Sequence, residues 1–200
     1  MNRRVLAIAL VFGIPISTAA KVSTEQRRAR LLQLRTEGSH VTNKSLLDQA
    51  YLDAVQLLEQ SGQCAAFFGG RDAVKALDSL VVQIHEERMN DSYIGISMNG
   101  PFMLAVGTNL TYRVFDHAAL NINGPFKKAK VFADEPFVPG VGSFRPNTRE
   151  ARVLILMHEL GHLIERDHRW LLPDDGTSPA QSRQNTKIVE KNCGAQIRAL

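Results

Sequence analysis

The residues best suited to chemistry lie together near position 160, in the run His158-Glu159-Leu160-Gly161-His162. On an α-helix, residues four apart differ by about 40° in azimuth and about 6 Å in rise, so both imidazoles project from one face and can bind one metal ion. Glu159 lies about 100° round the helix from His158, beside the ion rather than on it. From there its carboxylate can take a proton from a water activated by the metal. The spacing therefore predicts a metal site with an adjacent general base.

Zinc is the metal that this chemistry favours. Zn²⁺ accepts neutral imidazole nitrogen and, with one position open, lowers the pKa of a bound water to about 7. The flanking sequence fits an internal metal helix, because Glu159 is the only acidic or Lys/Arg residue between Val153 and Ile164. An exposed helix that carried the motif by accident would show more charge there. We therefore expect a buried helix whose polar groups face the metal.

A helix with this motif resembles the zincin metallopeptidases, which carry HExxH on a helix beneath a small sheet. The resemblance covers about 20 residues, from Asn147 to His168. It implies hydrolysis of a peptide or protein substrate, with zinc held by His158 and His162. In such a site Glu159 acts as general base on the water and then passes the proton to the leaving amine.

The resemblance leaves the third zinc ligand open, and Asp175 is the residue we favour. It lies in the loop WLLPDDG, 13 residues after His162, near the spacing of zincins whose third ligand is a loop Asp. The Gly-Thr-x-Asp pattern of that group is absent. Its neighbour Asp174 is a rival, and both carboxylates could instead cap their own turn. The apolar stretch 170–172 can pack back against the metal helix and hold this loop near the site.

Two further residues compete for the same role. His168 follows His162 by six residues, the spacing of metzincins, but Glu165 occupies the position of their usual glycine and no Met follows Met157. Glu190 lies 28 residues after His162 on the last predicted helix, and gluzincins take their third ligand from a later helix.

We expect the elements that must position these residues to form a single α+β domain, which the resemblance implies is zincin-like: N-terminal helices, a small twisted sheet, the buried metal helix and a C-terminal helix. Hydrophobic periodicity and end signals predict the helices, and short apolar segments separated by NGP and GTN turns predict the strands. By resemblance, one strand between residues 94 and 132 aligns the substrate main chain. The predicted helices span 23–38, 43–61, 72–89, 149–165 and 178–193, and the predicted strands span 93–98, 102–106, 110–115 and 119–123.

Three local signals refine this outline. The segment 64–70 is rich in turn formers and should separate two helices. Asn147 and Glu150 form a capping box that starts the metal helix. Ser178 followed by proline marks the start of the last helix, which should reach Cys193 just before a glycine.

The first 20 residues are predicted to be a secretory signal peptide. Arg3 and Arg4 precede a 12-residue apolar run, and small residues lead to expected cleavage after Ala20. The run is shorter than the roughly 20 residues that a membrane span needs, so we expect no span after cleavage. We expect a secreted or periplasmic domain from residue 21 to 200, with 21–42 as a loosely attached N-terminal helix.

Net charge argues against nucleic acid as a partner. The full sequence carries a formal charge of +4, with 24 basic and 20 acidic residues. Removal of Arg3 and Arg4 with the signal peptide leaves about +2, too little for strong binding to a phosphate backbone. We therefore expect no nucleic-acid partner.

Export also predicts a disulfide. Cys64 and Cys193 are the only two cysteines, neither has metal-ligand spacing, and an oxidising compartment would join them.

The other polar residues receive no catalytic role. His40, His85 and His117 lack partner spacing and are expected at the surface. Tyr112 and Arg113 are candidates for stabilising an oxyanion, but nothing local singles out either one. The competing functional class is a non-catalytic zincin-like module with structural or no metal, which binds an envelope component or another partner. A closed fourth ligand would indicate a structural metal, whereas an open position would indicate catalysis.

Overall fold

The computed structural model describes residues 24–37, 41–107, 109–129, 138–176 and 178–200. Within them the chain forms a mixed α+β fold, which confirms the predicted α+β class. The predicted signal peptide and His40 lie outside the described residues. The helices are α1 (Thr24–Glu37), α2 (Leu46–Glu59), α3 (Gln63–Phe68), α4 (Asp72–Gln83), α5 (Arg149–Leu163) and α6 (Pro179–Ile197), and the strands are β1 (Ile84–Glu87), β2 (Ile96–Val106), β3 (Thr111–Asn121), β4 (Ile164–Arg166) and β5 (Arg169–Trp170).

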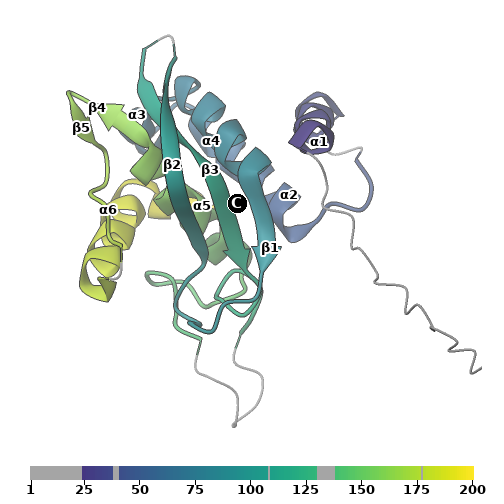
Figure 1. Ribbon diagram of the computed structural model, residues 1–200, viewed down its shortest axis with the longest axis vertical. Coiled ribbons are helices and arrows are strands. Elements are labelled where there is room, and N and C mark those ends of the chain that lie inside the picture. Colours follow the sequence, from purple (N-terminus) through teal and green to yellow (C-terminus); the bar gives the residue numbers. More distant parts are fainter. Residues whose placement is uncertain (1–23, 38–40, 108, 130–137, 177) are drawn as a thin grey trace, which may run out of the picture.

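Strand β3 is the centre of the mixed sheet. It pairs antiparallel with β2 along most of its length, parallel with β1 near its end and antiparallel with β4 at its start. Because β2 occupies one edge of β3, β1 and β4 share the other edge. Strand β5 extends this side by pairing with β4. Figure 1 shows the long β2–β3 pair, with α5 on one side of the sheet and α6 beyond it.

The helix predicted to span 72–89 is shorter in the structure, and that prediction was wrong at its C-terminal end. Helix α4 ends at Gln83, and the next four residues form β1 instead of continuing into solvent. Ile84 is buried opposite Ala118 of β3. Pairing with β3 and burial of a β-branched side chain outweigh the helical periodicity.

The four predicted strands form two long strands, because two of the expected breaks are absent. The NGP sequence at 99–101 is not a turn between strands but an irregularity within β2. The register shifts between Asn99 and Phe102, and Gly100 adopts a positive φ of 84°. A glycine in this conformation is typical of a bulge in a strand. The segment between 115 and 119 continues as one strand, β3.

The predicted turn at 64–70 contains a short helix, α3, which ends at Gly69 and Gly70, both with positive φ. A disulfide joins Cys64 of α3 to Cys193 of α6, which confirms the predicted pairing. Helix α6 does not end at Cys193 as predicted but continues through Gly194 to Ile197. Ile197 is fully buried, so packing carries the helix past the glycine.

Helix α5 runs through the core, as the scarcity of charged residues between Val153 and Ile164 predicts. All its residues from Val153 to Leu163 are buried except Glu159, which is partly buried. The helix packs against α2 and α6. At the N-terminal end of the domain, α1 packs on the same core through Leu31 and Leu34.

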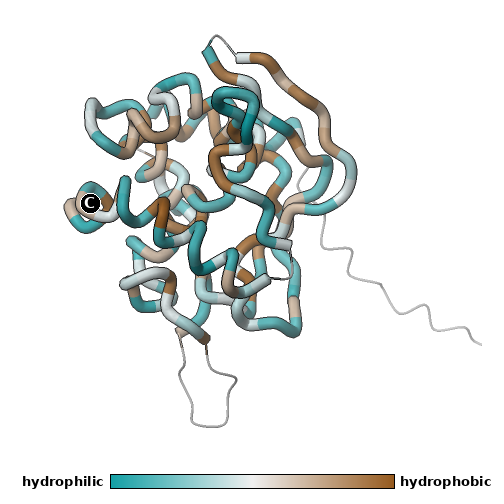
Figure 2. The backbone as a smooth tube through the Cα atoms, turned by 90° about the vertical axis from the view of Figure 1, so that its left-hand side faces the viewer, coloured by the Kyte–Doolittle hydropathy of each residue, from teal (hydrophilic) through white to brown (hydrophobic). Residues whose placement is uncertain are grey.

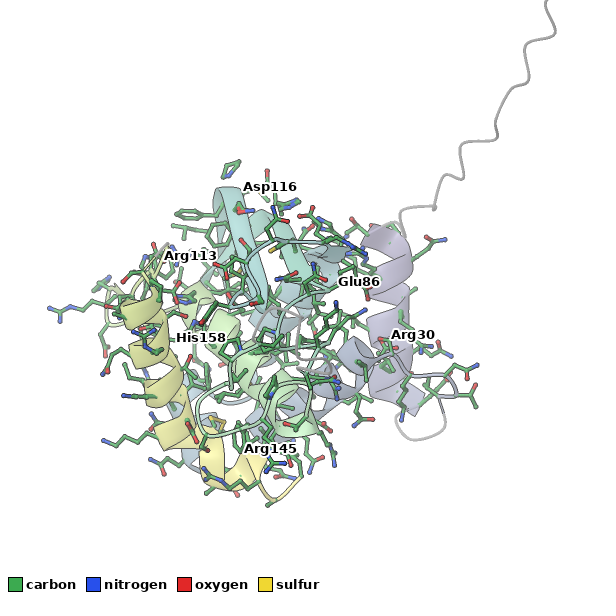
Figure 3. The ribbon with its side chains drawn as sticks, turned by 90° about the horizontal axis from the view of Figure 1, so that it is seen from below. Arg30, Glu86, Arg113, Asp116, Arg145 and His158 are labelled. Atoms are coloured by element: carbon green, nitrogen blue, oxygen red, sulfur yellow. A yellow bond between two sulfur atoms is a disulfide. The ribbon has the colours of Figure 1, made fainter. Side chains whose placement is uncertain are left out.

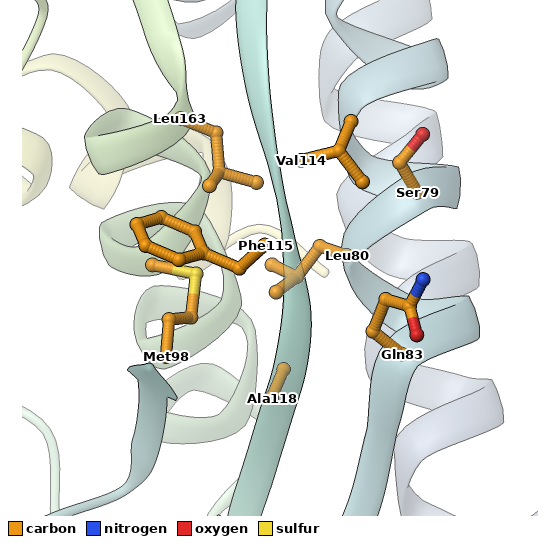
Figure 4. Close-up of a pocket in the computed structure, with 8 residues that line it drawn as sticks. All are labelled: Ser79, Leu80, Gln83, Met98, Val114, Phe115, Ala118 and Leu163. Carbon is orange, nitrogen blue, oxygen red and sulfur yellow. The ribbon is translucent and has the colours of Figure 1, made fainter. Parts of the chain in front are cut away.

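The space between α4 and the sheet is almost completely filled. A cavity of about 10 Å³ lies there, and Figure 4 shows the side chains that line it, among them Leu80, Val114 and Phe115. That is about the space of a single water, so this cavity cannot hold a larger ligand. Among the described helices, none is both long and apolar enough to cross a membrane.

Candidate metal centre

Helix α5 begins at Arg149 as predicted, but its N-cap is one residue later than the predicted Asn147, and it ends two residues before the predicted position 165. Thr148 is the N-cap, and its side-chain oxygen accepts a hydrogen bond from the backbone N–H of Ala151. Asn147 instead has a positive φ of 62°, and its side chain accepts a hydrogen bond from Arg152. The helix ends at Leu163 and passes directly into β4. It therefore fixes both histidines within its last two turns.

The two histidines meet the loop carboxylate of Asp175 in one cluster. His158 Nε2 lies 3.0 Å from His162 Nε2 and 3.1 Å from Asp175 Oδ2. His162 Nε2 lies 3.4 Å from the same oxygen. Zinc bonds of about 2.0–2.2 Å in tetrahedral geometry place neighbouring ligand atoms about 3.3–3.6 Å apart. The three donor atoms lie at or just inside this spacing, so shifts of a few tenths of an ångström would bring them around one zinc ion.

The hydrogen bond at the back of His158 determines which ring nitrogen carries its proton. The Thr186 hydroxyl donates to the Ser182 carbonyl at 2.9 Å, so it accepts from His158 Nδ1 at 3.0 Å. With the proton assigned to Nδ1, a neutral His158 presents a lone pair at Nε2. This lone pair faces the acceptor oxygen of Asp175 only 3.1 Å away. Two such acceptors repel unless a proton or a metal cation lies between them.

His162 is held through its backbone rather than through its ring. Its Nδ1 is buried and has no hydrogen-bond partner among the described residues. Its carbonyl oxygen, near the end of α5, accepts a hydrogen bond of 2.7 Å from Arg113 Nε. Carbonyls in the last turn of a helix lack helical partners, so this arginine satisfies one of them.

Arg113 connects three parts of the site. It lies on β3, is almost fully buried, and its guanidinium also donates to both carboxylate oxygens of Asp174. The guanidinium carbon lies 4.4 Å from the centre of the Trp170 ring, within the range of a cation–π contact. Figure 3 shows Arg113 and His158 on neighbouring elements. The arginine therefore ties β3, the end of α5 and the loop before Asp175 together.

The loop is also fastened directly to α5 and α6. The backbone N–H of Leu172 donates to the Gly161 carbonyl at 3.0 Å. A Cβ at Gly161 would lie 2.5 Å from a methyl carbon of Leu172, so this close approach requires glycine. On the other side, the side chain of Asn185 donates to the Pro173 carbonyl at 2.9 Å. These contacts hold the loop in place beside the histidines.

Burial and charge perturb the acidic groups around the cluster. Burial raises the pKa of Glu159, and the neighbouring His158 and His162 only partly offset this effect. Burial also raises the pKa of Asp175, but its contacts with the two imidazoles lower it by more, so this carboxylate stays ionised. Hydrogen bonds from Arg113 lower the pKa of Asp174.

The pKa of the His162 imidazole is raised, because nearby negative charge outweighs the effect of burial. Burial lowers its pKa, but the contact with Asp175 and the nearby charge of Glu159 raise it by more. The cluster therefore combines a negative field with converging nitrogen donors, an environment that stabilises a cation.

The structure places the three rival ligands away from the cluster. His168 is exposed in the tight turn between β4 and β5, where it and Asp167 both have positive φ. Glu190 accepts hydrogen bonds from Ser143 and Arg198. Asp174 is engaged by Arg113. Asp175 is thus the one of the four candidates that lies with both histidines.

Several residues in and around the two side-chain clusters were not predicted to lie there. Arg113 was among the oxyanion candidates, but its contacts are with a helix end and a loop. Thr186 lies on the predicted last helix, eight residues after Ser178. No sequence pattern indicated that its hydroxyl group would contact His158. His85 and His117, expected as isolated surface histidines, lie together with Glu87 in a second cluster. The alternation of His85 and Glu87 could have indicated one face of a strand.

Comparison with known proteins yields no relative. No protein-family model matches the chain, no curated protein matches it, and no solved structure matches it. The function is therefore inferred from the residues and geometry described above.

Proposed function

We propose that this chain is an exported, zinc-dependent peptidase of the zincin type, in which His158, His162 and Asp175 hold the metal. One observation carries the proposal: two imidazole nitrogens and a carboxylate oxygen converge within 3.0–3.4 Å of one another next to the carboxylate of an HExxH motif. Nitrogen and carboxylate donors at this spacing suit Zn²⁺. The disulfide is in keeping with an oxidising compartment.

Three protein ligands leave room for a fourth. Zinc held in this way supplies a Lewis acid and lowers the pKa of a water to about 7. Glu159 follows His158 directly and is not one of the three proposed metal ligands, so its carboxylate is available as a base. It acts as general base on the attacking water and returns the proton to the amine nitrogen of the departing peptide. Thr186 accepts a hydrogen bond from His158 Nδ1 and so keeps Nε2 turned toward the position of the metal.

Strand β2 is the element best placed to align a peptide. Among the described strands it pairs only with β3, so its other edge has no strand partner. Its distal half is apolar and exposed, most of all at Met103, Leu104 and Val106. Figure 2 shows this half as a mainly brown stretch on the outside of the molecule. An extended substrate can add to such an edge through main-chain hydrogen bonds, with apolar side chains against the strand.

The rim of this surface reaches the candidate metal centre. The ring of Phe102 on β2 lies 6.3 Å from that of Trp170, which stacks on Arg113. The edge strand and the segment that leads to Asp175 are therefore linked through aromatic contacts.

Peptide cleavage by the purified chain tests the proposal. The zinc-loaded protein should cleave members of a broad peptide library. Glu159→Gln should retain zinc, but its rate of cleavage should be about 10²–10⁴-fold lower than that of wild type. Glu165→Gln, a partly exposed glutamate just beyond the helix, is the matched control and should cleave at the wild-type rate. Equal rates for wild type and Glu159→Gln would remove Glu159 from the role of base.

A zinc-loaded chain that cleaves nothing would overturn the enzymatic proposal. The non-catalytic module would then account for the same residues, with the metal as a structural element.

A further inference from the structure

A second cluster of metal-ligating side chains lies on the sheet, at β1 and β3. His85 Nε2 is 2.7 Å from Glu87 Oε1, and His117 Nε2 is 3.6 Å from the same oxygen. The three ligand atoms all lie within 4.8 Å of one another. The two imidazole rings meet edge to face with their centroids 4.3 Å apart.

The strand pairing explains why these residues meet. His85 and Glu87 are two apart on β1, so their side chains lie on one face of the sheet. His85 pairs with Ala119 on the parallel strand β3, and His117 is the preceding position on the same face of that strand. Two hydrogen-bonded strands therefore set the spacing of the three ligands, without any loop.

The composition of the cluster suits a divalent transition metal. Two imidazoles and one carboxylate are ligands that zinc, copper and nickel accept in common. The side chains are 25%, 44% and 41% exposed for His85, Glu87 and His117, so an ion could enter from solvent and keep open positions for water. Edge-to-face imidazoles around one carboxylate oxygen need only small side-chain rotations to converge on a single ion.

The neighbouring charges do not oppose a cation. Glu86, between the two β1 ligands, is paired with Lys127, and Asp116, beside His117, is exposed. On β2, the residue opposite His117 is the neutral Asn99. No residue of the cluster belongs to the α5 site, and Figure 3, which labels Glu86 and Asp116, shows this part of the sheet apart from His158.

We propose that His85, Glu87 and His117 form a second, solvent-accessible binding site for a divalent transition metal ion, separate from the His158–His162–Asp175 centre. This site does not depend on peptidase activity or on occupancy of the α5 centre. Because its ligands are more exposed than those of that centre, it binds its ion more weakly.

Calorimetric titration of the full chain with Zn²⁺ tests this site. After one equivalent of Zn²⁺ has been added, wild type should bind a further equivalent. His117→Ala and His85→Ala should bind this second equivalent at least about tenfold more weakly than wild type, because each loses a direct ligand. Glu87→Gln keeps the shape of the side chain and should also bind more weakly.

His168→Asn is the matched control, because it removes another exposed histidine and asparagine tolerates the positive φ at that position. It should bind both equivalents like wild type. Circular dichroism of each variant checks that the fold is retained. If Zn²⁺ binding by His117→Ala and Glu87→Gln equals that of wild type, the second site does not exist. If the α5 centre binds no zinc, wild type still takes up one equivalent that His117→Ala loses, so the two proposals fail separately.

Discussion

Arg113 Nε donates a hydrogen bond of 2.7 Å to the backbone carbonyl oxygen of His162. This bond joins β3 to the last turn of α5, and the same guanidinium binds Asp174, the neighbour of the proposed ligand Asp175. The position of the third ligand relative to the second therefore depends on a strand residue that touches no metal. An arginine fork can make these contacts together, whereas a lysine cannot.

Arg113→Lys should therefore weaken zinc binding at the α5 centre. Lysine keeps the positive charge but cannot bond the His162 carbonyl and Asp174 at once, so the loop loses its tie to the helix. Loss of a residue that orients metal ligands costs about 10–100-fold in metal affinity. Competitive titration with a zinc chelator measures this change. Arg169→Lys, at an exposed arginine on β5, should leave the affinity unchanged, and an unchanged affinity in Arg113→Lys would show that Arg113 does not position the loop.

Gly161→Ala should displace the loop that carries Asp175. The new methyl group would lie 2.5 Å from Leu172 Cδ1, and Leu172 is fully buried, so its side chain has no free space to move into. We expect lower zinc affinity and a loss of stability of about 1–3 kcal/mol, the usual cost of overpacking. The double variant Gly161→Ala/Leu172→Ala removes the clash, and it should recover zinc affinity relative to Gly161→Ala. A single variant that binds zinc like wild type would contradict the proposed fit.

Thr186→Val should weaken zinc binding, and Thr186→Ser should not. Valine has nearly the shape of threonine but cannot accept the hydrogen bond from His158 Nδ1. His158 would lose the contact that fixes its proton and ring orientation, at a cost of about 10–100-fold in zinc affinity. The serine variant keeps the hydroxyl and serves as the control. Equal affinities for all three proteins would exclude a role for Thr186 behind the metal.

The buried hydroxyl group of Tyr51 should make the free energy of unfolding fall at alkaline pH. Burial and a hydrogen bond to Asp78 raise the pKa of its hydroxyl group. Because the folded state holds the neutral phenol, its stabilising effect is full below the unfolded pKa of about 10 and falls by up to about 1.4 kcal/mol per pH unit above it. Tyr51→Phe should lack this loss and should be about 1 kcal/mol less stable at pH 8. Its disadvantage should shrink by pH 11.

Urea unfolding at pH 8 and pH 11 measures both effects. Tyr93→Phe is the control, since Tyr93 is 62% exposed, and its stability should follow wild type at both values of pH. If Tyr51→Phe and wild type lose equal stability between pH 8 and pH 11, Tyr51 does not control the alkaline limit.

Local patterns in the sequence predicted the parts of the fold that depend on local physics. The uncharged run around His158 predicted a buried helix, and Ser178 with Pro179 predicted the start of α6. The disulfide could be predicted because the sequence contains only two cysteines, so each has one possible partner. The apolar residues before Asp174 predicted a loop that packs back on the helix, and Leu172 does so.

The contacts that assemble the two side-chain clusters could not be predicted from the sequence, because they depend on long-range pairing. Ile84 belongs to β1 rather than to the preceding helix because β3, more than 30 positions later, pairs with it. That same pairing brings His85 and His117 together. Arg113 meets His162 across 49 positions, and Thr186 meets His158 across 28. Spacing along the chain left Asp175, His168 and Glu190 comparable, and only the three-dimensional contacts separate them.

Zinc content after dialysis tests the central claim most directly, that His158, His162 and Asp175 together hold a zinc ion. Wild type should retain about one tightly held zinc per chain. Asp175→Asn should lose it, whereas His168→Asn and Glu190→Gln, which alter the other candidate ligands, should keep it. Zinc retained by Asp175→Asn as tightly as by wild type, or no zinc held by a folded wild-type chain, would contradict the account.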